Sequence, residues 1–155
     1  MSAHNKTEIG SLAPQTRILH TMLRVGDMQR SIDFYTKIIG MRVLRTLDQP
    51  KESYTLTFLG FGEESDTCVL ELTYNYGTSR YNMGNAYGHI AISVDDCYAA
   101  CADFKSKGGK VIHEPKRLPG SDETIAFVAD PDGYQIELIR RPLPRCQSVP
   151  DLVVA

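Results

Sequence analysis

The sequence lacks a surplus of basic charge: Lys and Arg number 17 against 19 Asp and Glu among 155 residues, a formal net charge of −2. A strong nucleic-acid binder carries a basic surplus or stripe, so no nucleic-acid partner is expected. No apolar run reaches 18 residues, so no membrane span is expected. Because the first residues have no apolar segment of the signal-peptide kind, we expect a cytoplasmic protein.

Cysteine is scarce, and its spacing is typical of neither a disulfide framework nor a zinc site. The four cysteines lie at positions 68, 97, 101 and 146, and none forms a Cys-x-x-Cys pair. Cys97 and Cys101 are four residues apart, which places them on one face of a helix. We expect structural thiols in a reducing compartment rather than disulfides or zinc ligands.

The length predicts one domain, flanked by two segments of different character. Residues 1–16 are typical of a flexible leader. Residues 142–155 contain three prolines within the first nine positions and are expected to form an extension without helix or strand. The predicted domain is therefore 17–141.

Within that domain the same pattern occurs twice. A strand-like run at 18–27 has its counterpart at 87–96, and each has a His near its start and an Asp at its end. The Asp can cap a helix, and apolar residues then recur at spacings of three and four. Glycines at positions 40 and 108 end the two expected helices.

Three strands are expected after each helix, which gives the order β-α-β-β-β twice. The expected strands are 41–44, 54–59 and 68–74 in the first half, and 110–113, 124–128 and 134–139 in the second. The sequence thus predicts an α+β fold of two tandem modules, at about 17–80 and 85–141, with helices on one side of mixed sheets. Asp130 and Asp132 fall in a Pro-Gly turn, where bonds to the local backbone are a better expectation than catalysis.

Four polar residues occupy equivalent places in the two modules. Strand alternation puts Glu71 and Glu137 on the face opposite the aliphatic residues of the last strand of each module, and His20 and His89 on that face of the first strand. The separations agree, since 89 − 20 is 69 and 137 − 71 is 66. If a pseudo-two-fold relates the halves, the four side chains can converge on a divalent metal. A structural His or a Glu on a solvated face is the alternative for each residue alone.

These segments together resemble glyoxalase I, a member of the vicinal oxygen chelate superfamily. The resemblance rests on Leu19–Asp27, Ser31–Tyr35, Leu70–Asn75, Tyr87–Ala91 and Ala126–Leu138, and it extends over about 17–141. It implies that the two modules form a curved mixed sheet around a metal site of His20, Glu71, His89 and Glu137. It also implies a homodimer in which one subunit gives the first His and Glu and the other subunit gives the second pair.

The resemblance further implies a substrate and a mechanism. The substrate would be the hemithioacetal of methylglyoxal and glutathione, isomerised through an enediolate to S-lactoylglutathione in methylglyoxal detoxification. Glu137 would be the principal base, with Glu71 as a ligand and possible second base. Arg24 and Asn75 would contact glutathione, and Lys116 and Arg117 lie in a loop expected near the glycyl carboxylate. An ordinary surface ion pair remains the alternative for Arg24, and solvated loop charge for Lys116 and Arg117.

Two departures from the animal and yeast pattern favour the short bacterial type. The segment 62–67 ahead of Glu71 is short, and Asn85 stands where many relatives carry Arg. This type is usually activated by Ni²⁺ or Co²⁺, although Zn²⁺ remains possible, and trypanothione is an alternative to glutathione. A thiol transferase, an extradiol dioxygenase or a non-catalytic drug-binding module on this fold is the rival reading. None of these explains a fourth metal-ligand position filled by His20.

Overall fold

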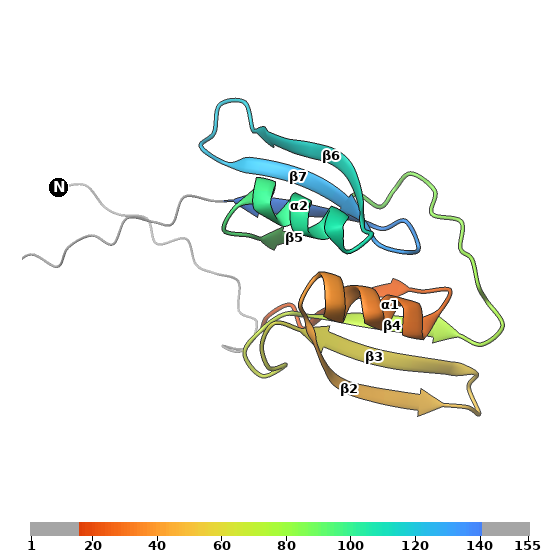
Figure 1. Cartoon of the computed structure of the whole chain (residues 1–155). Helices are drawn as coiled ribbons and strands as arrows, with labels where there is room; N and C mark the ends of the chain where they lie inside the picture. Colours follow the sequence, from red (N-terminus) through yellow and green to blue (C-terminus); the bar gives the residue numbers. More distant parts are fainter. Residues whose placement is uncertain (1–15, 141–155) are drawn as a thin grey trace, which may run out of the picture.

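The computed structural model describes residues 16–140. Residues 1–15 of the predicted leader, the predicted extension and Cys146 lie outside the described residues. Eight strands and two helical regions follow one another in two successive modules (Figure 1). The elements of module one are β1 His20–Arg24, α1 Met28–Asp33, the π-helical turn η1 Phe34–Ile38, β2 Arg42–Gln49, β3 Tyr54–Gly60 and β4 Val69–Asn75. Those of module two are β5 Ile90–Ser93, α2 Cys97–Ser106, β6 Lys110–Arg117, β7 Thr124–Ala129 and β8 Gln135–Arg140.

Each module forms a four-stranded mixed sheet, which confirms the predicted βαβββ pattern and the α+β class. The strand orders are β1-β4-β3-β2 and β5-β8-β7-β6. The first strand of each module runs parallel to the last one, and the remaining pairs are antiparallel. A helix and two further strands lie between the members of each parallel pair, and they provide the long connection that parallel strands need. The modules are therefore topological copies of each other.

The helices begin where the sequence places their caps. Asp27 has extended backbone and its carboxylate accepts a hydrogen bond from the Arg30 amide at 2.9 Å. Asp96 does the same for the amides of Tyr98 and Ala99. The first helix continues as a π-helical turn, in which the Ile39 amide donates to the Phe34 carbonyl. A wider turn was not predicted, because a spacing of three and four does not distinguish it from an α-helix.

Two strands, β2 and β6, extend several residues beyond their predicted ends, and both lie at a sheet edge. β2 continues from the expected end at Leu44 to Gln49, and its residues are almost all exposed. β6 continues to Arg117 through Pro115, with irregular pairing to β7. Polar edge positions lack the apolar alternation that marks a half-buried strand, and proline is tolerated there. The apolar pattern therefore indicates the core part of each strand and not its exposed end.

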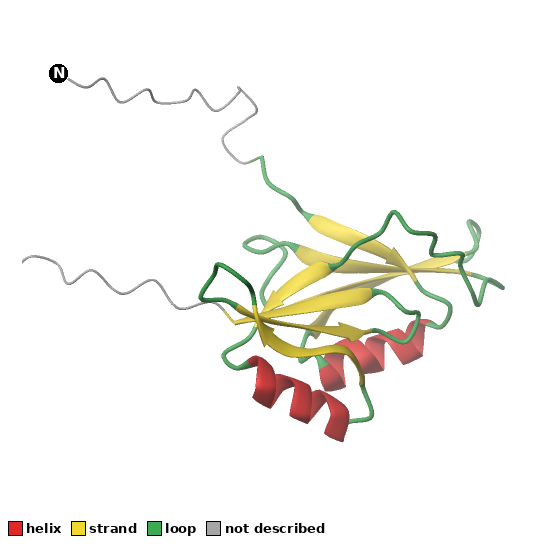
Figure 2. Ribbon diagram, turned by 90° about the horizontal axis from the view of Figure 1, so that it is seen from above, coloured by secondary structure: helices red, strands yellow, loops and turns green. Residues whose placement is uncertain are grey.

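Both helices lie on the same side of the sheets (Figure 2). The core lies between helices and sheets and includes Tyr35, Leu59, Leu72, Val128 and Ile136. The opposite face of each sheet carries polar residues from the alternate strand positions. Within residues 16–140, none of the helices is long and apolar enough to cross a membrane.

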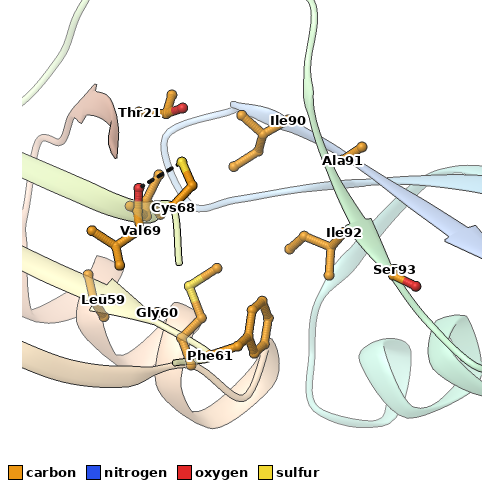
Figure 3. Close-up of a pocket in the computed structure, with 12 residues that line it drawn as sticks. Thr21, Leu59, Gly60, Phe61, Cys68, Val69, Ile90, Ala91, Ile92 and Ser93 are labelled. Atoms are coloured by element: carbon orange, nitrogen blue, oxygen red, sulfur yellow. Dashed lines mark hydrogen bonds between the residues drawn. The ribbon is translucent and has the colours of Figure 1, made fainter. Parts of the chain in front are cut away.

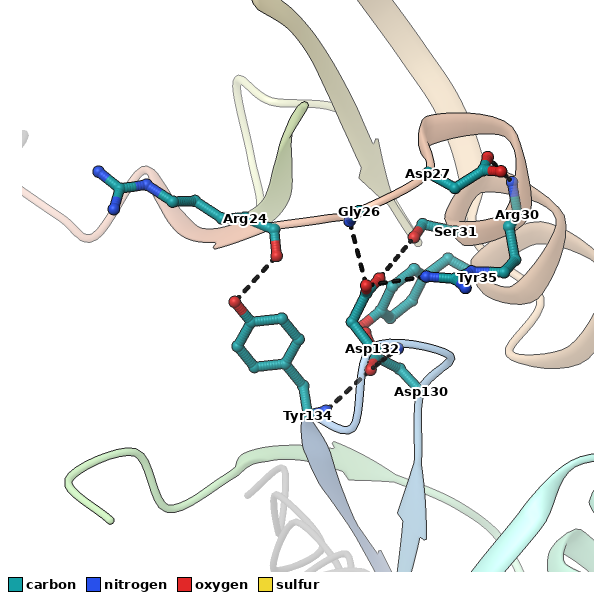
Figure 4. Close-up of polar contacts among 9 residues, drawn as sticks. All are labelled: Arg24, Gly26, Asp27, Arg30, Ser31, Tyr35, Asp130, Asp132 and Tyr134. Carbon is teal, nitrogen blue, oxygen red and sulfur yellow. Dashed lines mark hydrogen bonds and ion pairs between the residues drawn. The ribbon is translucent and has the colours of Figure 1, made fainter. Parts of the chain in front are cut away.

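A turn at residues 130–133, here named the inter-module turn, joins module two to module one (Figure 4). The Asp132 carboxylate accepts from the Gly26 amide at 3.0 Å and from the guanidinium of Arg30 at 2.8 Å. It also accepts from the hydroxyl of Ser31 at 3.3 Å. The sequence predicts local bonds for this turn, and Asp130 does accept from the amides of Asp132 and Tyr134. The contacts across the modules were not predicted.

Asp130 also takes part in the inter-module contact, through a buried hydrogen bond. The hydroxyl of Tyr35, which is fully buried, donates to the Asp130 carboxylate at 3.0 Å. Burial raises the pKa of Asp130 above its usual value, and burial beside this carboxylate raises the pKa of Tyr35. A neutral hydroxyl that donates to the carboxylate is thus the form that the folded protein favours.

Replacement of Tyr35 by Phe is expected to lower the free energy of unfolding by about 1–3 kcal/mol, because Asp130 loses a buried donor. The pKa of Tyr35 is raised in the folded state. The neutral hydroxyl therefore makes its whole contribution to the free energy of unfolding below pH 10.0, the usual pKa of tyrosine, and this contribution is lost as the pH rises above that value. Tyr35→Phe should therefore lose stability less steeply than the wild type above that pH. Urea unfolding at a series of pH values measures both effects. Tyr98→Phe, at an exposed position, is the matched control. Equal stability and equal slopes for all three proteins would contradict the assigned role.

Candidate metal centre

The parallel pairing of β1 with β4 brings the first predicted pair together. Met22 and Glu71 are register partners, and His20 lies two residues before Met22 on the same face of the sheet. The Nε2 atom of His20 lies 3.0 Å from the Oε2 atom of Glu71. Both side chains are therefore directed to one point on the face of the sheet opposite α1.

Module two repeats this arrangement nearly unchanged. His89 lies just before β5, and its Nε2 atom is 3.1 Å from Oε2 of Glu137 in β8. In module one, His20 is 39% exposed and Glu71 12%. In module two, His89 is 42% exposed and Glu137 13%. In both modules the imidazole reaches solvent while the carboxylate is mostly covered. Two independent copies with the same geometry favour a shared role over two unrelated surface contacts.

A phenylalanine supports each pair, and the sequence analysis missed both. Phe58 is the register partner of Glu71, and Phe127 is that of Glu137. The ring of Phe58 meets His20 edge-to-face at 5.7 Å between centroids, and Phe127 meets His89 in the same way at 5.3 Å. The repeat could have revealed them, because 127 − 58 is 69, the separation of the two histidines. Their edges fix the imidazole planes and exclude water from one side of each pair.

The two carboxylates differ in how firmly they are held. The hydroxyl of Thr73 donates to Oε1 of Glu71 at 3.2 Å. The equivalent position in module two, 66 residues later, is the aliphatic Ile139, which cannot donate. Within residues 16–140, Glu71 thus has two side-chain partners, His20 and Thr73, whereas Glu137 has His89 alone. The carboxylate of Glu137 is therefore held by fewer contacts than that of Glu71.

Module one has a further polar contact that the sequence analysis missed. The guanidinium of Arg45 lies 3.5 Å from the centroid of Phe58, and its Nε atom donates to Glu64 at 2.7 Å. The Arg45 hydrogen bond holds the pKa of Glu64 below its usual value. In module two the corresponding neighbour of Phe127 is His113, at 5.6 Å between ring centroids. The surroundings of the two His–Glu pairs therefore differ in charge.

The two pairs do not meet within one chain. Among residues 16–140, no group of three or more His, Cys, Asp or Glu side chains lies close enough to hold a metal ion. Each pair supplies one imidazole nitrogen and one carboxylate oxygen at contact distance on a solvent-reaching face. That donor set suits divalent first-row metals, so the residues fit a metal ion, but each pair supplies only two of the four ligands that the sequence analysis predicts.

The predicted substrate contacts fall into two groups. Arg24 ends β1 on the same face as His20, and Asn75 ends β4 on the same face as Glu71. The side-chain amide of Asn75 donates to the hydroxyl of Tyr81 at 2.9 Å. Both residues therefore lie at the far end of the face that carries the first His–Glu pair.

Lys116 and Arg117 lie at the end of the edge strand β6 in module two. Arg117 forms an ion pair with Asp122 and donates to the Ser121 carbonyl at 2.9 Å. Lys116 is exposed, and no ion pair is recorded for it within residues 16–140. The structure places these two cations apart from Arg24 and Asn75, on the other module.

The described residues also enclose an apolar cavity of about 480 Å³, lined partly by β1 and β5 (Figure 3). It is lined by core-side residues such as Leu59, Val69 and Ile92, and Cys68 also borders it. None of the His–Glu pairs lines it. Its walls are mostly apolar, with Thr21, Cys68 and Ser93 as the polar or thiol side chains. Three of the predicted thiols, Cys68, Cys97 and Cys101, are free. Burial raises the pKa of Cys97 and Cys101.

Comparison with known proteins adds an independent finding. The model of the Glyoxalase/Bleomycin resistance protein/Dioxygenase superfamily matches residues 17–138. The chain is 56% identical over 123 residues to a lactoylglutathione lyase of Escherichia coli O157:H7, which covers 79% of this chain and 91% of that relative.

The chain is also similar to solved structures of glyoxalase I. Glyoxalase I from Zea mays is 50% identical, with a TM-score of 0.78, over 81% of this chain and 44% of that chain. This chain thus spans less than half the length of the maize protein. A trypanothione-dependent glyoxalase I from Leishmania major is also 50% identical, with a TM-score of 0.73, over 81% of this chain and 86% of its own.

Proposed function

Because the chain belongs to the Glyoxalase/Bleomycin resistance protein/Dioxygenase superfamily, we propose that it detoxifies methylglyoxal as a lactoylglutathione lyase. The substrate is the hemithioacetal of methylglyoxal with glutathione, and the product is S-lactoylglutathione. The family implies a divalent metal cofactor. The observation that carries the proposal is the pair of equivalent His–Glu contacts at 3.0 Å and 3.1 Å.

The active enzyme is a homodimer with two sites at its interface. A His–Glu pair from module one of one subunit would face the module-two pair of the other. This arrangement accounts for two half-shells that reach solvent but lie apart within one chain. A closed two-fold assembly makes two identical composite sites, one on each side of the axis.

His20, Glu71, His89 and Glu137 would hold the metal. When bound, the ion supplies Lewis acidity that stabilises negative charge on the substrate oxygens as the C1 proton leaves. Ni²⁺ or Co²⁺ is favoured over Zn²⁺, on the support of the short segment 62–67 and of Asn85. The two imidazoles keep their geometry through the edges of Phe58 and Phe127.

Glu137 takes the proton from C1 of the hemithioacetal and returns it to C2. Its carboxylate is mostly covered and lacks the second hydrogen bond that Thr73 gives to Glu71. A carboxylate held by fewer hydrogen bonds reorients more easily toward the C1 proton. Glu71 remains a ligand and a possible second base for the other face of the hemithioacetal.

Arg24 and Asn75 bind the peptide part of the substrate at the far end of the module-one face. Lys116 and Arg117 meet the glycyl carboxylate from the module-two side. The Arg117–Asp122 ion pair would have to open for this contact. We place the reaction in the cytoplasm, because glutathione is kept reduced there.

Replacement of Glu137 by Gln keeps the size of the side chain and removes the base. Turnover should fall by about 10²- to 10⁴-fold, while the unfolding temperature should change little. Thioester formation from methylglyoxal and glutathione by the metal-loaded protein, followed by its ultraviolet absorbance, measures the loss. The matched control is Glu114→Gln, an exposed glutamate that pairs with Lys105 outside the site. Near-wild-type turnover of Glu137→Gln would rule out its assignment as the base.

The shared site can be tested by mixing two inactive proteins. One carries His20→Ala with Glu71→Gln, and the other carries His89→Ala with Glu137→Gln. After unfolding and joint refolding, half of the dimers are mixed and each has one intact site, so about a quarter of wild-type activity is expected. Each variant refolded alone is the control. An inactive mixture that nevertheless contains mixed dimers would show that the sites are not shared between subunits.

The activity restored by each metal ion distinguishes the class activated by Ni²⁺ or Co²⁺ from the class activated by Zn²⁺. The protein is stripped with a chelator and then receives Ni²⁺, Co²⁺ or Zn²⁺ separately. Activity should disappear on stripping and return with Ni²⁺ or Co²⁺ more strongly than with Zn²⁺. No activity with any of the three ions would contradict the function, and recovery with Zn²⁺ alone would contradict the assigned metal class.

A further inference from the structure

A polar pocket of about 340 Å³ lies beyond the end of β1, against the inter-module turn. Its walls include three arginines, Arg24, Arg30 and Arg80, and one carboxylate, Asp132. Three positive charges against one negative charge leave a net charge of +2 in the lining. A pocket of this charge attracts an anionic group.

The three guanidinium groups are not equivalent. Arg30 is neutralised, because it pairs with Asp132 at 2.8 Å, and Asp132 also accepts from the Gly26 amide. Within residues 16–140, no ion pair or hydrogen bond is recorded for the side chains of Arg24 and Arg80, and both residues are exposed. In Figure 4 the side chain of Arg24 extends away from the inter-module turn. The pocket therefore has two unpaired cations.

The chain around Arg80 is held on both sides. The hydroxyl of the next residue, Tyr81, accepts from the Asn75 side chain at 2.9 Å. The carbonyl of the preceding residue, Ser79, packs against Gly26, where a Cβ atom would come within 2.1 Å of it. Only glycine permits this approach at position 26. Arg80 thus lines the same pocket as Arg24, and among the described residues its backbone is held there without an ion pair of its own.

We propose that Arg80 is a specificity-determining residue, which binds a carboxylate of the peptide thiol together with Arg24. This inference rests on the proposed function and adds a residue to its substrate site. A carboxylate between two guanidinium groups makes charge-assisted hydrogen bonds to both. Arg80 therefore selects thiols with a free carboxylate at this end over thiols in which that group is amidated or esterified.

The dimensions of the site agree with this role. Arg24 is four residues beyond His20 along β1, which places their Cα atoms about 13 Å apart. An extended tripeptide is about 10 Å long. The reacting carbons hang from the central cysteine, so neither end of the adduct reaches the Cα atom of Arg24, and the long arginine side chains must cover the remaining distance to the carboxylate. The pocket and the first His–Glu pair belong to the same subunit, so this reach does not depend on how two subunits meet.

Glutathione has two carboxylates, one on the γ-glutamyl residue and one on glycine, and the pocket chemistry suits either. The hemithioacetal of the glycyl ethyl ester distinguishes them, because that thiol keeps only the γ-glutamyl carboxylate. If the effect of an Arg80 substitution persists with the ester, the γ-glutamyl carboxylate is bound here. If it disappears with the ester, the glycyl carboxylate is bound here.

The test compares Arg80→Gln and Arg80→Lys with the wild type. For the glutathione hemithioacetal, KM should rise about three- to tenfold in Arg80→Gln with kcat nearly unchanged, and Arg80→Lys should recover part of the loss. Arg140→Gln is the matched control. It removes the same charge from an exposed arginine in β8, on the face of that sheet opposite Glu137 and outside the pocket. An unchanged KM in Arg80→Gln, or an equal rise in Arg140→Gln, would overturn the inference.

Direct binding of S-methylglutathione separates this inference from the proposed function. This ligand binds but does not react. Calorimetry should show that its Kd is about three- to tenfold higher for Arg80→Gln than for the wild type. A wild type that binds this ligand through Arg80 but forms no thioester would contradict the lyase function and leave the pocket assignment in place. A Kd that is the same in both proteins would overturn the pocket assignment, whatever the turnover.

Discussion

The parallel pairing between the first and last strand of each module is the constraint on which the site depends. In both modules this pairing sets the register so that an imidazole near the start of one strand meets a carboxylate of the other, at 3.0 Å and 3.1 Å. A slip by one residue would turn each carboxylate into the apolar core. The antiparallel neighbour then adds a phenylalanine opposite each Glu. The chemistry is therefore built into the sheet register and not into loops.

The inter-module turn links the two modules at the end of β1, beside the proposed substrate contact Arg24. Asp132 binds the Gly26 amide beside Arg24, and the hydroxyl of Tyr134 donates to the Arg24 carbonyl at 2.9 Å. Tyr134 lies three residues before Glu137. A single set of contacts thus connects the strand that carries the proposed base with the strand that carries a proposed substrate cation, although the two belong to different modules.

Much of the fold could be predicted because the sequence states it twice. Alternation and capping gave the two modules, the starts of both helices and the core parts of the strands. The exposed ends of β2 and β6 could not be predicted, since residues such as Asp48 and Lys116 carry no apolar pattern. The π-helical turn was also missed, because an extra residue in one turn leaves the local apolar spacing almost unchanged. The four proposed ligands were found by symmetry, and the same symmetry would have found Phe58 and Phe127.

The sequence by itself determined the module pattern and the His–Glu pairs, because these depend on residue type, alternation and repeat spacing, and its resemblance to glyoxalase I indicated the family. Only the tertiary structure decided that the pairs stay apart within the described chain, that Thr73 holds one Glu and not the other, and that Asp130 and Asp132 join the modules. It also placed Arg80 in the lining of the same pocket as Arg24. These features depend on contacts between residues far apart in the sequence, and periodicity along a chain carries no information about such distances.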